Sequence, residues 1–113
     1  MCDNNCLDKI LDAVFNKATD IFSDGFKKII LYGSYARGDC DDQSDIDIMI
    51  IADFPKAFEW DYRRQFAEFT SRLGLQFDVV ISVVIKDSET FNKFADVVPF
   101  YQNVLREGIS YAG

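Results

Sequence analysis

Two short apolar runs bracket one polar segment, and this arrangement constrains the fold more than any other feature of the chain. The runs occupy residues 28–32 and 45–52. Both are rich in β-favouring residues and have the length of buried strands. Polar groups stand where the two strands adjoin the intervening segment, Gly-Ser at its start and Asp-Ile-Asp at its end. The sequence therefore predicts two strands that present polar groups to one site.

The Gly33-Ser34 pair, called the phosphate turn below, follows the first predicted strand directly. Gly33 permits a tight turn and the close approach of another group. Ser34 stands where the N-cap of a short helix over residues 35–37 would stand, with Gly38 ending that helix. Helix starts attract anions, and a serine hydroxyl can donate to a phosphate oxygen. An ordinary strand–turn–helix junction uses the same residue types, so the pair alone does not decide between the two readings.

Asp45 and Asp47, called the carboxylate pair below, open the second predicted strand. Residues i and i+2 of a strand point to one face, with Cα atoms roughly 6.6 Å apart. Two carboxylates so close repel each other and resist desolvation. Mg²⁺ relieves both costs because it prefers hard oxygen ligands and completes its shell with phosphates and water. The alternative is a solvated strand entrance that carries two charges.

A third carboxylate, Asp78, falls within residues 76–84, which read as another strand. An acid inside an apolar strand is costly unless it is paired or bound to a metal. If this strand neighbours the second one, Asp78 joins the carboxylate pair on one face. Three convergent carboxylates are typical of a two-metal site for phosphoryl or nucleotidyl transfer. A salt bridge from Asp78 to a lysine or arginine is the alternative.

The combined pattern resembles the minimal nucleotidyltransferase (MNT) branch of the DNA polymerase β-type superfamily. The phosphate turn continues as Gly-Ser-Tyr-Ala-Arg-Gly, the carboxylate pair stands in Ser-Asp-Ile-Asp, and Asp78 follows later. Residues 104–111 also resemble the closing helix and Glu-Gly turn of that branch. The resemblance covers about residues 7–111, and the combined motif is specific although each piece is common.

The resemblance implies transfer of a nucleoside monophosphate, most plausibly AMP, from ATP with Mg²⁺. Asp45, Asp47 and Asp78 would be the catalytic residues and metal ligands, and Asp78 would help to deprotonate the acceptor hydroxyl. Gly33 and Ser34 would hold the β- and γ-phosphates. Arg37 would either reach a phosphate or pair with the acidic segment 39–42, and the abundance of neighbouring opposite charges favours the pairing.

The resemblance also implies a biological partner. Many stand-alone members are MntA-like antitoxins that act beside a helical HEPN-type toxin, so the expected acceptor is a hydroxyl of that toxin. Two other functions stay open. In the first alternative, the chain is a binding subunit that neutralises a partner by contact alone. In the second, it is a transferase that acts on a small molecule such as an aminoglycoside. A homo-oligomer is a further possibility.

Helical and strand patterns alternate along the 113 residues, which suffice for one domain spanning residues 1–113. Apolar residues recur at helical spacing over residues 7–22, and the pattern predicts a second helix from Pro55 to Gly74. A third helix is expected to start near Ser88, which is one candidate for its N-cap, and residues 99–106 are expected to form the last helix. The expected fold class is α/β (α+β), a small mixed sheet covered by helices on one side.

Charge and composition restrict the classes of molecule that the chain is expected to bind. The net charge of −7 disfavours a nucleic-acid polymer as partner, because such binding depends on clustered Lys and Arg. The chain lacks a membrane-spanning run and a signal peptide, and its three cysteines fit reduced thiols in a cytoplasmic protein. Most of the eleven Phe residues belong in a core. A surplus would form an apolar patch for a partner, with these candidates: Phe54, Phe58, Trp60, Phe100 and Tyr101.

Overall fold

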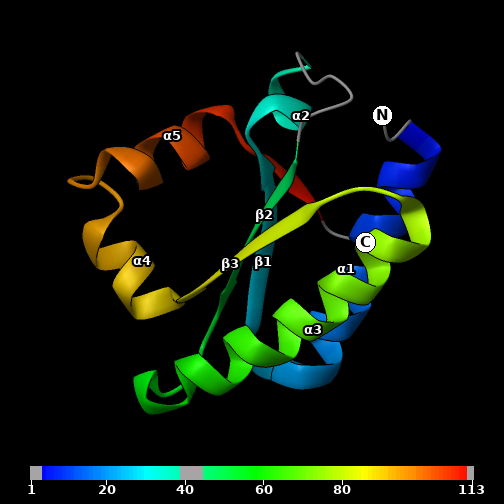
Figure 1. The fold of residues 1–113 in the computed structure, drawn as a ribbon. Helices are drawn as coiled ribbons and strands as arrows, with labels where there is room; N and C mark the ends of the chain where they lie inside the picture. The colour runs from blue at the N-terminus through cyan, green and yellow to red at the C-terminus, as the bar shows by residue number, and fades with distance from the viewer. Residues whose placement is uncertain (1–3, 39–44, 112–113) are drawn as a thin grey trace.

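The computed structural model describes residues 4–38 and 45–111. Helices and strands alternate along most of the chain (Figure 1). The helices are α1 (Asn4–Phe22), α2 (Ser34–Arg37), α3 (Glu59–Phe77), α4 (Ser88–Phe94) and α5 (Pro99–Glu107), with short 3₁₀ turns η1 (Ser23–Gly25) and η2 (Lys56–Phe58). The strands are β1 (Phe26–Tyr32), β2 (Ile46–Ala52), β3 (Ile81–Asp87) and β4 (Ile109–Tyr111).

The four described strands form one mixed sheet in the order β3-β2-β1-β4. β1 runs antiparallel to both β2 and β4, and β2 runs parallel to β3. The register places Tyr32 opposite Asp47, and Asp47 beside Ser82 of β3. The end of β1 and the beginnings of β2 and β3 therefore meet at one end of the sheet. This is the α/β class expected from the alternating pattern.

Helices cover both faces of the sheet, which corrects the expectation of a single covered face. Figure 1 shows α1 and α3 on one face and α4 and α5 on the other. The reason lies in β2, which is apolar on both faces. Ile48 and Ile50 join the main core with α1 and α3, whereas Met49 and Ile51 pack in a second cluster with side chains of α4 and α5. Burying both sets of side chains requires two helical layers.

The helix boundaries differ from the sequence expectation at several points. Pro55 precedes η2, so α3 begins at Glu59 and not at the proline. Gly74 does not close α3, which continues to Phe77 because that side chain still packs against the main core. The cap of α4 is Asp87 and not Ser88, since the Asp87 carboxylate accepts a 3.0 Å hydrogen bond from the Thr90 N–H.

The aromatic residues divide between core and surface. Phe22 stacks on Phe66 inside the main core, and Tyr101 is buried in the second cluster. Of the proposed surface patch, Phe58 and Trp60 are exposed near the start of α3, whereas Phe100 is exposed at the start of α5. The five candidates therefore do not form one patch on adjoining helices.

Two further expectations concern the cysteines and the membrane. Cys6, in the first turns of α1, is disulfide-bonded, so the expectation of reduced thiols is wrong at this position. Cys2 and Cys40 lie outside the described residues. Within residues 4–38 and 45–111, none of the helices is both long and apolar enough to cross a bilayer.

Candidate active site

The phosphate turn lies directly after β1 and begins α2. Gly33 adopts φ 75° and ψ −155°, a backbone conformation that is available almost exclusively to glycine. Its carbonyl accepts hydrogen bonds of 3.1 Å from the N–H groups of both Ala36 and Arg37. Gly33 is therefore the N-cap instead of Ser34, and the helix begins at Ser34, one residue earlier than expected. Gly38 ends α2 in the left-handed conformation, as expected.

The carboxylate pair lies against this turn. Asp45 precedes β2 and is exposed, whereas Asp47 is half-buried within the strand. A Cβ atom added to Gly33 would overlap the Asp47 carboxylate, so the backbone of the turn and the carboxylate are in direct contact. Only a residue without a side chain permits this approach. The strand register thus joins two motifs that are separated by ten residues in the sequence.

The Asp47 carboxylate carries an electrostatic penalty. Burial raises the pKa of Asp47 above its ordinary value of 3.8, the charge of Asp45 raises it further, and the guanidinium of Arg37 lowers it in part. A half-buried carboxylate beside a second carboxylate is the environment in which a divalent cation relieves both desolvation and repulsion. The two side chains therefore fit a Mg²⁺ ion as oxygen ligands.

This penalty predicts the effect of neutralising Asp47. A carboxyl whose folded-state pKa is raised destabilises the fold when it ionises, and the penalty fades as pH falls below the unfolded pKa. We therefore expect Asp47→Asn to melt at a higher temperature than the parent protein at neutral pH without metal or nucleotide. The difference should shrink as the pH is lowered through the carboxylate range. Thermal melts across pH measure both effects.

Asp53 provides the matched control for that experiment. It lies just beyond the other end of β2, where it accepts a hydrogen bond from Ser88 and pairs with Lys27 at 3.2 Å, and these contacts lower the pKa of its carboxyl. Asp53→Asn should therefore melt at a lower temperature than the parent at neutral pH. A lower melting temperature for Asp47→Asn would contradict the repulsion inferred at the carboxylate pair.

Asp78 does not lie inside a strand, which corrects the sequence interpretation. It is the exposed, left-handed residue (φ 58°) that ends α3, and the next residue, Val79, donates a 3.0 Å hydrogen bond to the Gly74 carbonyl. Aspartate tolerates this conformation, which is typical of a helix stop. The strand begins only at Ile81, because the helical packing of Phe77 extends α3 into the segment that reads as a strand.

The described residues contain no group of three or more Asp, Glu, His or Cys side chains arranged to hold a metal ion. Asp78 is thus not brought into such a group with the carboxylate pair. It nevertheless precedes the start of β3 at the same end of the sheet, where the Ile46 N–H donates to the Val80 carbonyl at 2.9 Å. Asp78 therefore lies at the same end of the sheet as Asp45 and Asp47, but its carboxylate does not form a cluster with theirs.

Arg37 has a partner that the sequence did not reveal. Its guanidinium lies 3.4 Å from the Glu107 carboxylate at the end of α5. The acidic segment 39–42, the favoured partner in the sequence interpretation, lies outside the described residues. Both Arg37 and Glu107 are partly exposed, so their pairing is worth little in stability. Because Arg37 also affects the pKa of Asp47, its charge acts at the carboxylate pair.

Tyr32 is a further site residue that sequence reasoning missed. It is the last residue of β1 and the register partner of Asp47. Burial, and then the charge of Asp47, raise the pKa of the Tyr32 phenol to about 12. The phenol therefore stays protonated at neutral pH. Its position immediately before the phosphate turn was the available signal, because antiparallel pairing with the second strand places it opposite a carboxylate.

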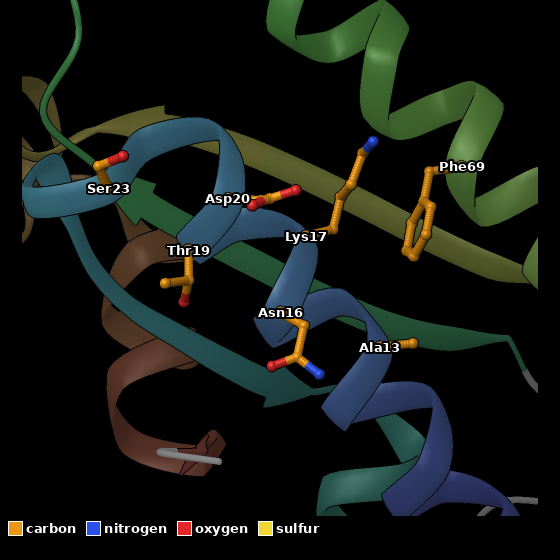
Figure 2. A pocket seen from close by; sticks show the side chains of 7 residues that line it. All are labelled: Ala13, Asn16, Lys17, Thr19, Asp20, Ser23 and Phe69. Carbon is orange, nitrogen blue, oxygen red and sulfur yellow. The ribbon is translucent and has the colours of Figure 1, made fainter.

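A separate hollow lies on the other side of the molecule, between α1 and α3. Figure 2 shows side chains of α1 and Ser23 along it, with Phe69 of α3 at one side. The Lys17 ammonium stands 5.5 Å from the centroid of the Phe69 ring. Asp20 is the single carboxylate among the lining residues. The hollow therefore lacks the paired acids and the glycine turn that mark the site at the end of the sheet.

Comparison with known proteins identifies the family to which the chain belongs. The family model described as a nucleotidyltransferase domain matches residues 14–109. A Methanocaldococcus jannaschii protein named as a putative protein adenylyltransferase is 38% identical over 101 residues, which cover 89% of this chain and 93% of that protein.

Solved structures share the fold. A crystal structure of a toxin–antitoxin with AMP-PNP aligns with a TM-score of 0.54 at 23% identity, covering 87% of this chain and 69% of the other. A mutant of the toxin–antitoxin MntA–HpeT aligns with a TM-score of 0.51 at 21% identity, covering 90% and 72%.

Proposed function

This chain belongs to the nucleotidyltransferase family, and on that premise we propose that it transfers AMP from ATP to a hydroxyl group of a partner protein. One observation carries the proposal. The backbone of Gly33 lies against the Asp47 carboxylate, so the turn that we propose to bind phosphate and the pair that we propose to bind the cation are in contact. A metal-bound nucleoside triphosphate needs a phosphate site and a cation site next to each other, because the cation is bound to the phosphates.

The proposed assignments follow from this contact. Asp45 and Asp47 would hold Mg²⁺, which when bound neutralises the charge that develops on the α-phosphate. Ser34, the first residue of α2, and the backbone of Gly33 would bind the β- and γ-phosphates. Arg37 would add its charge to the phosphates, since its effect on the pKa of Asp47 puts it within electrostatic reach of the site.

The transfer step balances without a further reactant. The acceptor hydroxyl oxygen forms a bond to the α-phosphorus, the bond from that phosphorus to the α–β bridging oxygen breaks, and pyrophosphate leaves with the electron pair. We assign the hydroxyl proton to Asp78. Its exposed position at this edge of the sheet suits contact with an acceptor that arrives from solvent. To serve as a third metal ligand as well, Asp78 would have to lie closer to Asp45 and Asp47 than it does in this structure.

Three observations support a protein acceptor. Proteins named as protein adenylyltransferases are among the relatives of this chain, and toxin–antitoxin complexes are among the structures that share its fold. The net charge of −7 disfavours a nucleic-acid acceptor. The proposed partner is therefore a toxin, of the HEPN type that the sequence resemblance implies, with the present chain as its antitoxin.

The experiment uses the product of the neighbouring gene as acceptor. The two proteins are mixed with ATP and Mg²⁺, and the intact mass of the neighbour is measured. We expect an increase by one or more AMP units, and no increase when EDTA replaces Mg²⁺. Tight binding and full neutralisation of the neighbour with no change in mass would overturn transfer and establish the contact-only alternative.

A further inference from the structure

An exposed aromatic ring stands next to the candidate site on the face of the sheet covered by α4 and α5. Phe100 follows Pro99 in the first turn of α5 and remains 42% exposed. Its ring contacts the ring of Tyr32 edge to face, with the centroids 5.7 Å apart and an interplanar angle of 82°. Phe100 is therefore a partly open aromatic ring that packs on Tyr32, the residue opposite Asp47 in the sheet.

The sheet register fixes how near this ring lies to the carboxylates. Tyr32 is the Cα partner of Asp47, so their side chains leave the same face of the sheet. The charge of Asp47 also contributes to the raised pKa of the Tyr32 phenol, which places the phenol near the carboxylate. Phe100 is therefore separated from the carboxylate pair by a single aromatic side chain, and the phosphate turn begins at the residue after Tyr32.

The Phe100 ring is held in place by its neighbours. On the side of α5 it packs against Tyr101, with the ring centroids 5.8 Å apart, and Tyr101 is buried in the second cluster with Phe91. Pro99 fixes the start of the helix, because its φ is preset for the first helical position. A ring anchored on two sides and still partly open is a preorganised surface for stacking.

From this arrangement we infer that Phe100 stacks on the nucleobase of the bound triphosphate and, with Tyr32, forms a base-binding subsite beside the carboxylate pair. The inference rests on the proposed function, because the base is tied to phosphates held at the phosphate turn. Stacking uses the π-face common to all bases and needs no hydrogen-bonding code. The subsite therefore takes a nucleobase by shape and stacking, with a purine gaining the larger contact area.

The test separates the base from the phosphates. Binding of ATP and of inorganic tripolyphosphate, each with Mg²⁺, is measured by calorimetry for the parent, Phe100→Leu and Phe100→Trp. Leucine keeps the apolar packing on Tyr101 but removes the aromatic face. We expect Phe100→Leu to bind ATP roughly five- to a hundredfold more weakly, with tripolyphosphate unchanged. Phe100→Trp should keep or strengthen ATP binding.

Leu105→Ala is the matched control, since Leu105 lies on the same helix and is 47% exposed. It should leave both affinities unchanged. Unchanged ATP binding in Phe100→Leu, or equal losses for ATP and tripolyphosphate, would overturn the subsite alone. If Phe100→Leu lost AMP transfer to the acceptor protein but still bound ATP normally, Phe100 would be a contact for that protein, and the base-binding subsite would be overturned. Failure of the parent to bind either probe would overturn the proposed function together with the subsite.

Discussion

Asp47→Ala is expected to abolish AMP transfer and the rise in melting temperature that Mg²⁺ and ATP confer on the parent protein. Asp47 is the member of the carboxylate pair that touches the Gly33-Ser34 turn, so under the proposed function its loss would remove a cation ligand next to the bound phosphates. A ligand that binds only the folded state stabilises it in proportion to its affinity, and that stabilisation disappears with the binding. Loss of several kcal/mol of charge stabilisation corresponds to about a thousandfold or more in rate.

The control for Asp47→Ala is Asp53→Ala. Both acids adjoin β2, but Asp53 lies at the opposite end of the strand, paired with Lys27. Asp53→Ala should lower the melting temperature of the apo protein and leave transfer and the ligand-induced rise intact. The measurements are intact-mass assays of the acceptor and thermal melts with and without Mg²⁺ and ATP. A full ligand-induced rise in Asp47→Ala would remove Asp47 from the cation site.

Gly33→Ala is expected to eliminate triphosphate binding and to destabilise the fold. The backbone angles of Gly33 cost any other residue about 1–3 kcal/mol. The added methyl group would also overlap the Asp47 carboxylate and push it from its place. Backbone strain and displacement of Asp47 therefore combine at one position. Under the proposed function Ser34→Ala would remove a single hydrogen bond to phosphate, worth roughly 1.5–3 kcal/mol, so the binding defect of Gly33→Ala should be the larger of the two.

Gly38→Ala is the control that separates the effect of backbone strain from the effect of the contact between residue 33 and Asp47. Gly38 also has a positive φ of 81°, but a Cβ added there meets no atom within 4 Å among the described residues. Its substitution should cost roughly 1–2 kcal/mol of stability through the left-handed backbone alone and leave ATP binding near the parent value. Thermal melts and ATP calorimetry on both variants make the comparison. Equal ATP affinities for Gly33→Ala and the parent would refute the role of the Gly33–Asp47 contact.

The secondary structure around the site was predictable because local patterns decide it. The apolar runs at β1 and β2, the glycine between β1 and α2, and the helical spacing of α1 each reflect short-range preferences of the backbone. Residues i and i+2 of a strand share a face wherever the strand goes, so the carboxylate pair was also readable from spacing. The family assignment followed from the same motifs.

Asp78 shows where local patterns fail. Its neighbours Phe77 and Val79 are β-favouring, yet α3 continues through Phe77 and Asp78 becomes a helix stop. The choice depended on the packing of Phe77 against the main core, a contact between segments distant in the sequence. Tertiary burial overrides propensity in such segments because it contributes more free energy than the differences among intrinsic preferences.

The sequence by itself determined the strand–turn–helix order, the glycine turn, the carboxylate pair and the membership of the nucleotidyltransferase family. Only the tertiary structure decided that Tyr32 stands opposite Asp47, that Arg37 pairs with Glu107, 70 residues further along the chain, and that helices cover both faces of the sheet. The physical reason is that backbone preferences act over a few residues. Contacts between β1, β2 and α5 instead depend on register and on the burial of apolar surface, which only the whole folded chain fixes.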